Sequence, residues 1–271
     1  MFRKLKYYLD VGWYNIKLSI QRQTEYPLFL IGWLIANPLQ FVFALITIYA
    51  TVSNFGSING WDFHEITFLY GVSIVSHGLA VVLFIQTWYC QYLVLEGGFD
   101  RLLLRPMSVF FQFITMDFNL IGVTDMLPGL VIFVYGWVSV GLALSAANVL
   151  KMLVVIVGAT LIHGAVYTAI AALAFYTKGG RPLVFISLEL DRYTTLYPMS
   201  IYPTAIQAVF TFALPLGFLS FYPSAEFLGK GTEMLPTGHL WLLTLVVGGA
   251  AYALALMLFQ RGLKRYESAG S

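Results

Sequence analysis

Long apolar runs separated by short polar segments make up most of the chain after residue 26. A helix that crosses a bilayer needs about 20 mainly apolar residues. Six runs meet this requirement. The pattern therefore predicts an all-α integral membrane protein with a single transmembrane domain over residues 1–271, whose approximate spans are 27–52, 66–95, 119–147, 153–177, 203–221 and 239–260.

Three of the predicted spans carry signals of their own. The run 109–116 before the third span is either interfacial or the first part of a helix that bends at Pro128. The fourth span is dense in Gly, Ala and Thr, which let helix backbones approach closely in lipid. Pro215 and Gly217 interrupt the fifth span, and Pro223 suits the first turn of a short helix after it. We therefore expect an irregular or re-entrant segment at the outer face, where protein or water must satisfy the freed backbone.

The first 25 residues have the pattern of an amphipathic helix that lies on a membrane surface. Apolar residues recur there at three- or four-residue spacing, with basic residues elsewhere around the helix. An uninterrupted apolar core and a small-residue cleavage site are both missing from this segment, so we expect it to stay in the mature protein. The apolar positions are Leu5, Leu9, Trp13, Ile16 and Ile20.

The distribution of basic residues predicts the orientation, because Lys and Arg are retained on the cytoplasmic side. With the N- and C-termini inside, 13 of the 15 basic residues fall in cytoplasmic pieces and only Lys151 and Lys230 fall outside. Residues 96–106 then form a cytoplasmic loop between spans two and three. The 13 residues are Arg3, Lys4, Lys6, Lys17, Arg22, Arg101, Arg105, Lys178, Arg181, Arg192, Arg261, Lys264 and Arg265.

Composition excludes several classes of protein. Hydrophobic residues make up 59% of the chain and charged residues only 10%, against about 25% charged residues in a soluble domain. A net charge of +2 with dispersed basic groups gives no nucleic-acid footprint. Because Cys90 is the only cysteine, neither an intrachain disulfide nor a thiolate metal cage is possible.

The chain carries no catalytic motif. A phosphate loop of the GxxxxGK[ST] type is missing, because Ser224 stands where its first glycine belongs and Gly231 where Ser or Thr should follow Lys230. HExxH and GxSxG motifs are also missing. We therefore assign no catalytic residue and no metal ligand, and we expect the chain not to be an enzyme.

Three ionisable residues lie within or near the predicted spans. Polar groups in lipid are costly, which makes His77, His163 and Asp125 candidate functional residues. A neutral histidine that donates to a neighbouring helix carbonyl is an equally complete explanation of the two histidines. Asp125 could simply reach interfacial water or a basic residue such as Arg105. The sequence leaves both interpretations open.

The segment 96–106 has the features of a short cytoplasmic helix. Gly97 and Gly98 can end span two with positive φ values, and Asp100 would offset the positive end of the helix dipole in the first turn. Pro106 would stop the helix. The leucines at 102–104 would form one side, with the arginines at 101 and 105 on another. Such a helix either docks in a groove of a soluble partner or rests at the interface with its arginines on lipid phosphates.

Three sequence patches together resemble a known family. They are Gly97 to Pro106, with the pattern G-x-x-D-x-x-L-x-R-P; Leu196 to Pro203, which reads LYPMSIYP; and Leu214 to Ala225, which reads LPLGFLSFYPSA. In order and spacing they are similar to the permease subunits of ABC-2 type transporters, in the six-span branch called ABC-2 membrane family 6. The resemblance covers nearly the whole chain.

The resemblance implies a permease that exports a substrate with ATP hydrolysed by a separate subunit. The expected partners are two cytoplasmic ABC ATPase subunits, a second permease that is identical or related, and membrane lipids. ATP and Mg would be bound by the ATPase, with no cofactor in this chain, and the location would be the bacterial plasma (inner) membrane. The aromatic-rich spans favour an amphipathic or lipid-like cargo. The alternatives are a secondary transporter and a non-transport membrane scaffold or assembly factor.

The same resemblance suggests two sets of functional residues. The ATPase-coupling set is Glu96, Gly97, Gly98, Phe99, Asp100, Arg101, Leu102, Leu103, Arg105 and Pro106. The gate or path set is Tyr202, Pro203, Pro215, Gly217, Phe221, Tyr222, Pro223, His77 and Asp125.

Overall fold

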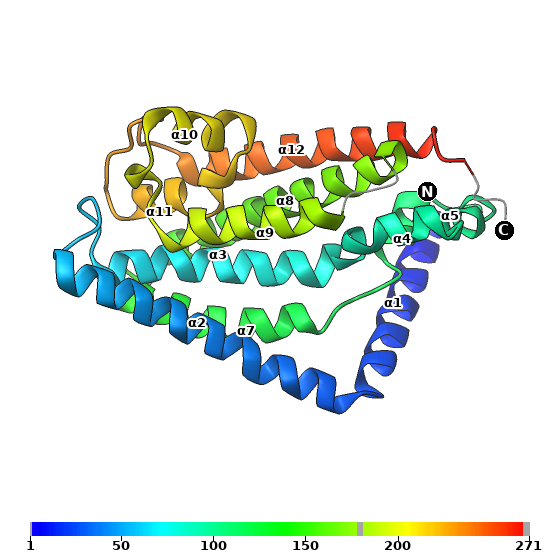
Figure 1. The fold of residues 1–271 in the computed structure, drawn as a ribbon, viewed down its shortest axis with the longest axis horizontal. Helices are drawn as coiled ribbons and strands as arrows, with labels where there is room; N and C mark the ends of the chain where they lie inside the picture. The colour runs from blue at the N-terminus through cyan, green and yellow to red at the C-terminus, as the bar shows by residue number, and fades with distance from the viewer. Residues whose placement is uncertain (1, 178–180, 268–271) are drawn as a thin grey trace.

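A computed structural model describes residues 2–177 and 181–267, without the side chains of 2–5 and 181. The described part of the chain is a bundle of helices (Figure 1). The long helices are α1 (Phe2–Thr24), α2 (Pro27–Phe55), α3 (Phe63–Phe84), α7 (Ile121–Ser139), α8 (Ala146–Thr177), α9 (Arg181–Leu196) and α12 (Leu240–Leu263). The short ones are α4 (Cys90–Leu95), α5 (Gly98–Leu103), α6 (Val109–Ile114), α10 (Thr204–Ala208) and α11 (Phe221–Phe227).

In the part of the chain that the structure describes, five helical segments are long and apolar enough to cross a membrane, and they overlap with five of the six predicted spans. The second of them runs from α3 through a 3₁₀ turn into α4. The run 109–116 contains a separate short helix, α6, and is not part of α7. The five segments are Pro27–Phe55, Phe63–Leu95, Ile121–Ser139, Ala146–Thr177 and Leu240–Leu263.

The predicted fifth span over residues 203–221 does not form a spanning helix, although it is interrupted at Pro215 as predicted. This segment consists of α10, a π-helical turn over Val209–Ala213 and a 3₁₀ turn over Leu216–Leu219. Pro215 lacks an amide hydrogen and cannot continue a helix, and Leu214 before it is extended. The chain then enters α11, in whose first turn Pro223 lies as predicted.

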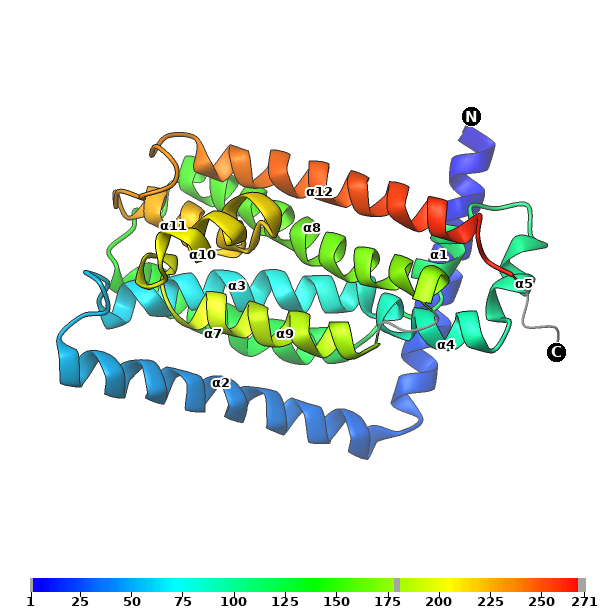
Figure 2. The ribbon, with the colours of Figure 1, turned by 45° about the horizontal axis from the view of Figure 1, so that its top comes forward.

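Helix α9 is a second departure from the prediction. The sequence places Arg181 and Arg192 in a cytoplasmic loop, but residues 181–196 form a helix that runs along α3 and α8 (Figures 1 and 2). The charges of this segment hid it from a search for apolar runs. Arg192 therefore lies on a helix, where it is exposed and lines a cavity. Lys178, the third basic residue of that predicted loop, lies outside the described residues.

Helix α1 crosses the end of the bundle where α5 and the C-terminal end of α12 also lie (Figure 2). Polar side chains hold it to the segment between α6 and α7: Asn15 donates to Thr115, and Gln23 donates to the Phe118 carbonyl and accepts from the Leu120 amide. Leu9 and Trp13, predicted to lie on its apolar face, are exposed. Ile16 and Ile20 of the predicted apolar stripe are partly buried, so only its N-terminal part is free to face lipid.

Glycines allow the backbones of two helix pairs to touch. Along α3 and α7, a Cβ built on Gly71, Gly122 or Gly136 would lie 2.5 or 2.6 Å from an atom of the facing backbone. Between α8 and α12, a Cβ on Gly248 would lie 2.3 Å from the Gly158 carbonyl oxygen. In lipid, where the hydrophobic effect does not drive helices together, small residues allow the close van der Waals packing that does.

Candidate functional site

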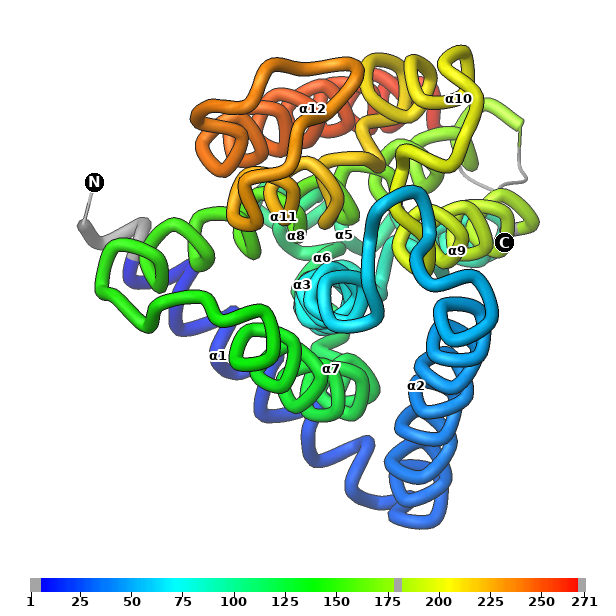
Figure 3. The backbone as a smooth tube through the Cα atoms, turned by 90° about the vertical axis from the view of Figure 1, so that its left-hand side faces the viewer, coloured from blue at the N-terminus to red at the C-terminus, as the bar shows by residue number. Residues whose placement is uncertain are grey.

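A cavity of about 470 Å³ lies between α2, α3, α7 and α9, the four helices that Figure 3 shows end-on. Its wall mixes aromatic and aliphatic side chains with polar ones. Two other cavities, of about 330 and 280 Å³, are smaller. The polar and ionisable residues of the wall are Asn37, Gln40, Tyr70, Ser73, His77, Tyr89, Asn119, Asp125, Glu189, Asp191, Arg192 and Thr195.

Asp125 and Asn37 form the polar contact between α7 and α2. The Asn37 amide donates to the Thr124 hydroxyl at 2.9 Å, and it also lies within hydrogen-bonding reach of Asp125. Both Asn37 and Asp125 are buried. The interpretation in which Asp125 reaches Arg105 is wrong, because Arg105 is exposed at the end of the bundle beyond α5.

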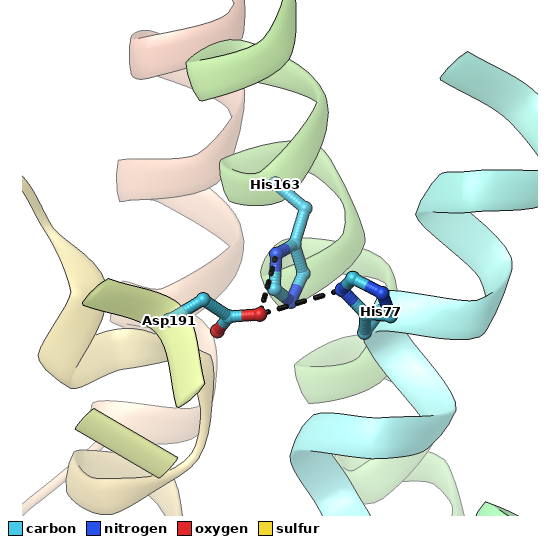
Figure 4. Close-up of side chains that lie close together, drawn as sticks. All are labelled: His77, His163 and Asp191. Atoms are coloured by element: carbon cyan, nitrogen blue, oxygen red, sulfur yellow. Dashed lines mark ion pairs between the residues drawn. The ribbon is translucent and has the colours of Figure 1, made fainter. Parts of the chain in front are cut away.

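His77, His163 and Asp191 meet where α3, α8 and α9 pack together (Figure 4). His77 Nδ1 lies 3.3 Å from Asp191 Oδ2, and His163 Nδ1 lies 3.8 Å from the same oxygen. The Tyr167 hydroxyl lies 3.3 Å from His77 Nδ1. The interpretation in which each histidine donates to a helix carbonyl is therefore replaced by one shared carboxylate. One ligand atom from each of the three residues lies within 4.8 Å of the others.

Asp191 is the functional candidate that the sequence analysis missed. Its segment contains too many charges for a lipid-facing span, and it was read as a loop. Helical periodicity could have found it, because Val184, Leu188, Asp191 and Thr195 recur at three- or four-residue spacing and the first and last of the four are buried. What the sequence could not show is that both histidines face this side of α9.

Helix α5 forms the predicted coupling region, with a different orientation from the one expected. Gly97 has a positive φ of 71°, and Asp100 lies in the first turn, as predicted, whereas Gly98 is already helical. The buried side chains are Phe99 and Leu102. Leu103 and Leu104 are 50% and 86% exposed whereas Leu102 is buried, so the prediction that the three leucines form one side of the helix is wrong.

Phe99 anchors α5 in an aromatic cluster at this end of the bundle. Its ring centroid lies 5.0 Å from that of Phe175, 5.5 Å from Phe113 and 5.6 Å from Tyr266. The buried Gln112 amide donates to the Leu102 carbonyl at 3.0 Å, which satisfies a free acceptor at the end of the helix. Burial and, after it, the neighbouring Asp100 carboxylate raise the pKa of Tyr266 to about 12.

The exposed side of α5 carries the rest of the predicted coupling set. Glu96, Arg101, Arg105 and Pro106 are exposed around Leu103 and Leu104. We call these six residues the α5 surface. It presents an apolar centre with charges around it, which is the usual composition of a protein–protein contact.

The other predicted gate residues lie at the opposite end of the bundle and do not line the cavity. Gly217, Phe221, Tyr222 and Pro223 are buried, and the hydroxyls of Tyr222 and Thr211 form a hydrogen bond. Tyr202 is partly buried, as is Pro215, while Pro203 is exposed. Of the predicted gate residues, only His77 and Asp125 meet in the cavity.

Lys230, one of two basic residues that the orientation rule leaves outside, lies at the same end as these residues. It forms an ion pair with Glu65 at 2.9 Å and donates to the Gly60 carbonyl at 2.6 Å. Its ammonium group also lies 4.9 Å from the centre of the Trp61 ring. These local contacts give a structural reason for a basic residue at this end of the bundle, where the orientation rule expects none.

A family model described as an ABC-2 family transporter protein matches residues 38–270. The chain belongs to this family. No curated protein matches the chain. The match includes α5, all of α3, α7 and α9 around the cavity, and the segment from α10 to α11.

Membership in the ABC-2 family makes this chain a multi-pass transmembrane permease of an ABC transporter. Permeases of this family have no catalytic site of their own and associate with an ATP-binding subunit. The exposed α5 surface and the cavity are accordingly the two regions to examine for coupling and for transport.

Proposed function

We propose that this chain is one of two permeases in an exporter that moves an amphipathic or lipid-like molecule across the bacterial inner membrane. Two cytoplasmic ATPase subunits would bind ATP and Mg, and the second permease would be identical or related. Family membership supports the transport role. The observation that carries the proposal for the ATPase contact is the α5 surface.

The α5 surface suits force transmission because its helix is firmly attached. Phe99 and Leu102 bury one side of α5 in the bundle, while Leu103 and Leu104 stay exposed between Arg101 and Arg105. A partner that grips the exposed leucines would pull on the cluster that joins α5 to α8 and α12 through Phe175 and Phe259. A rigid-body movement of the ATPases would thereby reach the spanning helices.

The cavity is the proposed start of the cargo path. It lies between α2, α3 and α9, and its wall combines aromatic rings with Asp125, Glu189 and Arg192. Such a lining suits a molecule with an apolar body and a polar head. The outward side of α2 is rich in exposed apolar side chains, which leaves room for lipid or for the second permease.

Helix α9 completes the proposed topology. It runs in the opposite direction to α8 and ends where the segment from α10 to α11 begins (Figure 1). Counting α9 as the fifth crossing gives six crossings with both termini in the cytoplasm. Its 16 residues are short for a bilayer, and the re-entrant segment behind it would cover the remaining thickness.

Co-purification of an ATPase tests the proposal. The chain would be expressed with its neighbouring genes, purified in mild detergent and assayed for bound ATP hydrolysis. Leu104→Asp should reduce the recovered ATPase at least about tenfold, as expected for loss of a central interface residue worth over 1.4 kcal/mol. Leu144→Asp is the matched control, because Leu144 is 83% exposed at the other end of the bundle and should leave recovery unchanged.

Two results would contradict the proposal. Recovery of no ATPase with the wild-type chain would favour a scaffold or assembly role, and equal recovery with Leu104→Asp would remove α5 from the contact. Transport by this chain alone in liposomes without nucleotide would instead indicate a secondary transporter.

A further inference from the structure

We propose that His77, His163 and Asp191 bind a divalent transition-metal ion, with Zn²⁺ as the best fit. The three residues come from α3, α8 and α9, so the ion would join three helices in the interior of the bundle. Neither the transport role nor family membership requires such a site.

The distances suit a tetrahedral ion. Zn²⁺ binds imidazole nitrogen and carboxylate oxygen at about 2.0–2.1 Å, which places neighbouring ligand atoms of a tetrahedron about 3.3 Å apart. Asp191 Oδ2 lies 3.3 Å from His77 Nδ1 and 3.8 Å from His163 Nδ1. The three ligand atoms lie within 4.8 Å of one another, so side-chain rotations that draw them closer would bring all three onto one ion.

Unsatisfied polar atoms point in the same direction. His163 Nε2 and Asp191 Oδ1 are buried and have no hydrogen-bond partner among the described residues. The His163 side chain is only 3% exposed. An unpartnered buried donor or acceptor is costly, and a hydrogen bond between His77 and Asp191 leaves both of these atoms unexplained. An ion that binds His163 through Nε2 and the Asp191 carboxylate through both oxygens would use both of these atoms.

The types of ligand select the metal. Two imidazoles with one carboxylate are a common set for Zn²⁺, whereas Ca²⁺ and Mg²⁺ prefer shells of oxygen. His77 and Asp191 line the cavity, which gives an ion a way in and gives a water molecule access to the fourth position. The Tyr167 hydroxyl, 3.3 Å from His77 Nδ1, lies beside the same site.

The ion would balance the negative charge that Asp191 of α9 brings into the bundle. This helix places the Asp191 carboxylate, whose side chain is only 13% exposed, against the imidazoles of His77 and His163. A divalent cation offsets this charge and attaches α9 to α3 and α8. Metal binding should then stabilise the folded chain, since a ligand that binds only the native state raises its stability.

Metal analysis of the full chain tests the site. The protein would be purified in detergent without a histidine tag, exposed to excess ZnSO₄ and passed through gel filtration before elemental analysis. Wild type should retain about one ion per chain, as one three-ligand site predicts. His163→Gln should retain less than about a fifth of that, in line with the 10–100-fold or greater losses of affinity seen when metal sites are disturbed. His77→Gln and Asp191→Asn should behave in the same way.

His64→Gln is the matched control. His64 lies at the N-terminal end of α3, beside Tyr135 and away from the cluster, and its replacement should leave the retained zinc unchanged. In a second measurement, Zn²⁺ should raise the Tm of wild type and of His64→Gln but not of His163→Gln, and a chelator should reverse the effect.

A wild-type chain that retains no zinc would overturn the proposal. So would a His163→Gln protein that elutes as a folded monodisperse species and still binds one ion. If Asp191→Asn does not fold, His163→Gln decides the matter. Because these measurements need neither an ATPase nor a cargo, their failure would leave the proposed transport role untouched.

Discussion

Replacing Phe99 with Ala should release α5 from the bundle while the spanning helices stay folded. Phe99 is completely buried, and with Leu102 it is one of only two buried side chains on this six-residue helix. A helix this short has no stability of its own in water, because most helical stability in proteins comes from packing. The docking of α5 therefore depends on these two side chains.

The size of the effect follows from the burial of the ring. Truncating a buried Phe to Ala costs about 3–5 kcal/mol, and every 1.4 kcal/mol is a factor of ten in an equilibrium constant. The population of detached α5 should rise by on the order of a hundredfold or more. Phe99→Leu, which keeps most of the volume, should cost less than about 1.5 kcal/mol and raise the population about tenfold.

Hydrogen exchange measured by mass spectrometry reads this population directly. Amides of residues 100–104 should exchange on the order of a hundredfold faster in Phe99→Ala, while peptides from α3 and α8 keep their wild-type rates. Leu104→Ala is the control, because Leu104 is 86% exposed on the same helix and its loss should change the rates by less than about threefold. Equal rates in Phe99→Ala and wild type would refute the anchoring role, as would faster exchange throughout the chain.

Three further changes test other contacts. Gly248→Ala should lower the Tm in detergent, because its Cβ would meet the Gly158 carbonyl at 2.3 Å at a cost of about 1–3 kcal/mol. Gly249→Ala, which has open space around it, should leave the Tm unchanged, and equal Tm values for the two variants would contradict the close contact. Glu226→Ala should destabilise the start of α12 by about 0.5–2 kcal/mol, because the Glu226 carboxylate accepts hydrogen bonds from the backbone amides of His239 and Trp241. Denaturant unfolding measures this loss of stability, which should be smaller for Glu226→Gln. Gln23→Leu should detach α1 from the bundle, because the Gln23 side chain forms hydrogen bonds with the backbone of Phe118 and Leu120. Proteolysis near residue 25 should then be faster, and an unchanged rate would mean that other contacts hold α1.

Apolar run length and small-residue content predicted much of the fold. Five spanning segments, the dense packing of α8, the break at Pro215 and the ends of α5 were all readable from the sequence, because each depends on local chemistry. Helix α9 was not, because its Asp191 lies against His77 of α3 and His163 of α8, which are more than 20 positions away in the sequence. A count of apolar residues cannot anticipate such pairing.

Some residues of the candidate site could likewise be predicted from the sequence, and others could not. His77 and Asp125 were found because an ionisable residue in an apolar run is conspicuous, and they do line one cavity. Asp191 was missed because it stands among other charges. The three leucines at 102–104 were assigned to one side of α5 because they look alike in sequence, but only Leu102 packs in the cluster with Phe113.

The glycine contacts between α3 and α7 determine where the protein can change over evolutionary time. Any side chain at Gly71, Gly122 or Gly136 would collide with backbone, so these positions accept almost no substitutions. The cavity wall formed by α3 and α7 is thereby nearly fixed, whereas α2 is mostly exposed and can accept many replacements. Relatives that handle different molecules should therefore differ mainly at α2 positions such as Trp33 and Gln40, and attempts to redirect the specificity of this transporter should begin there.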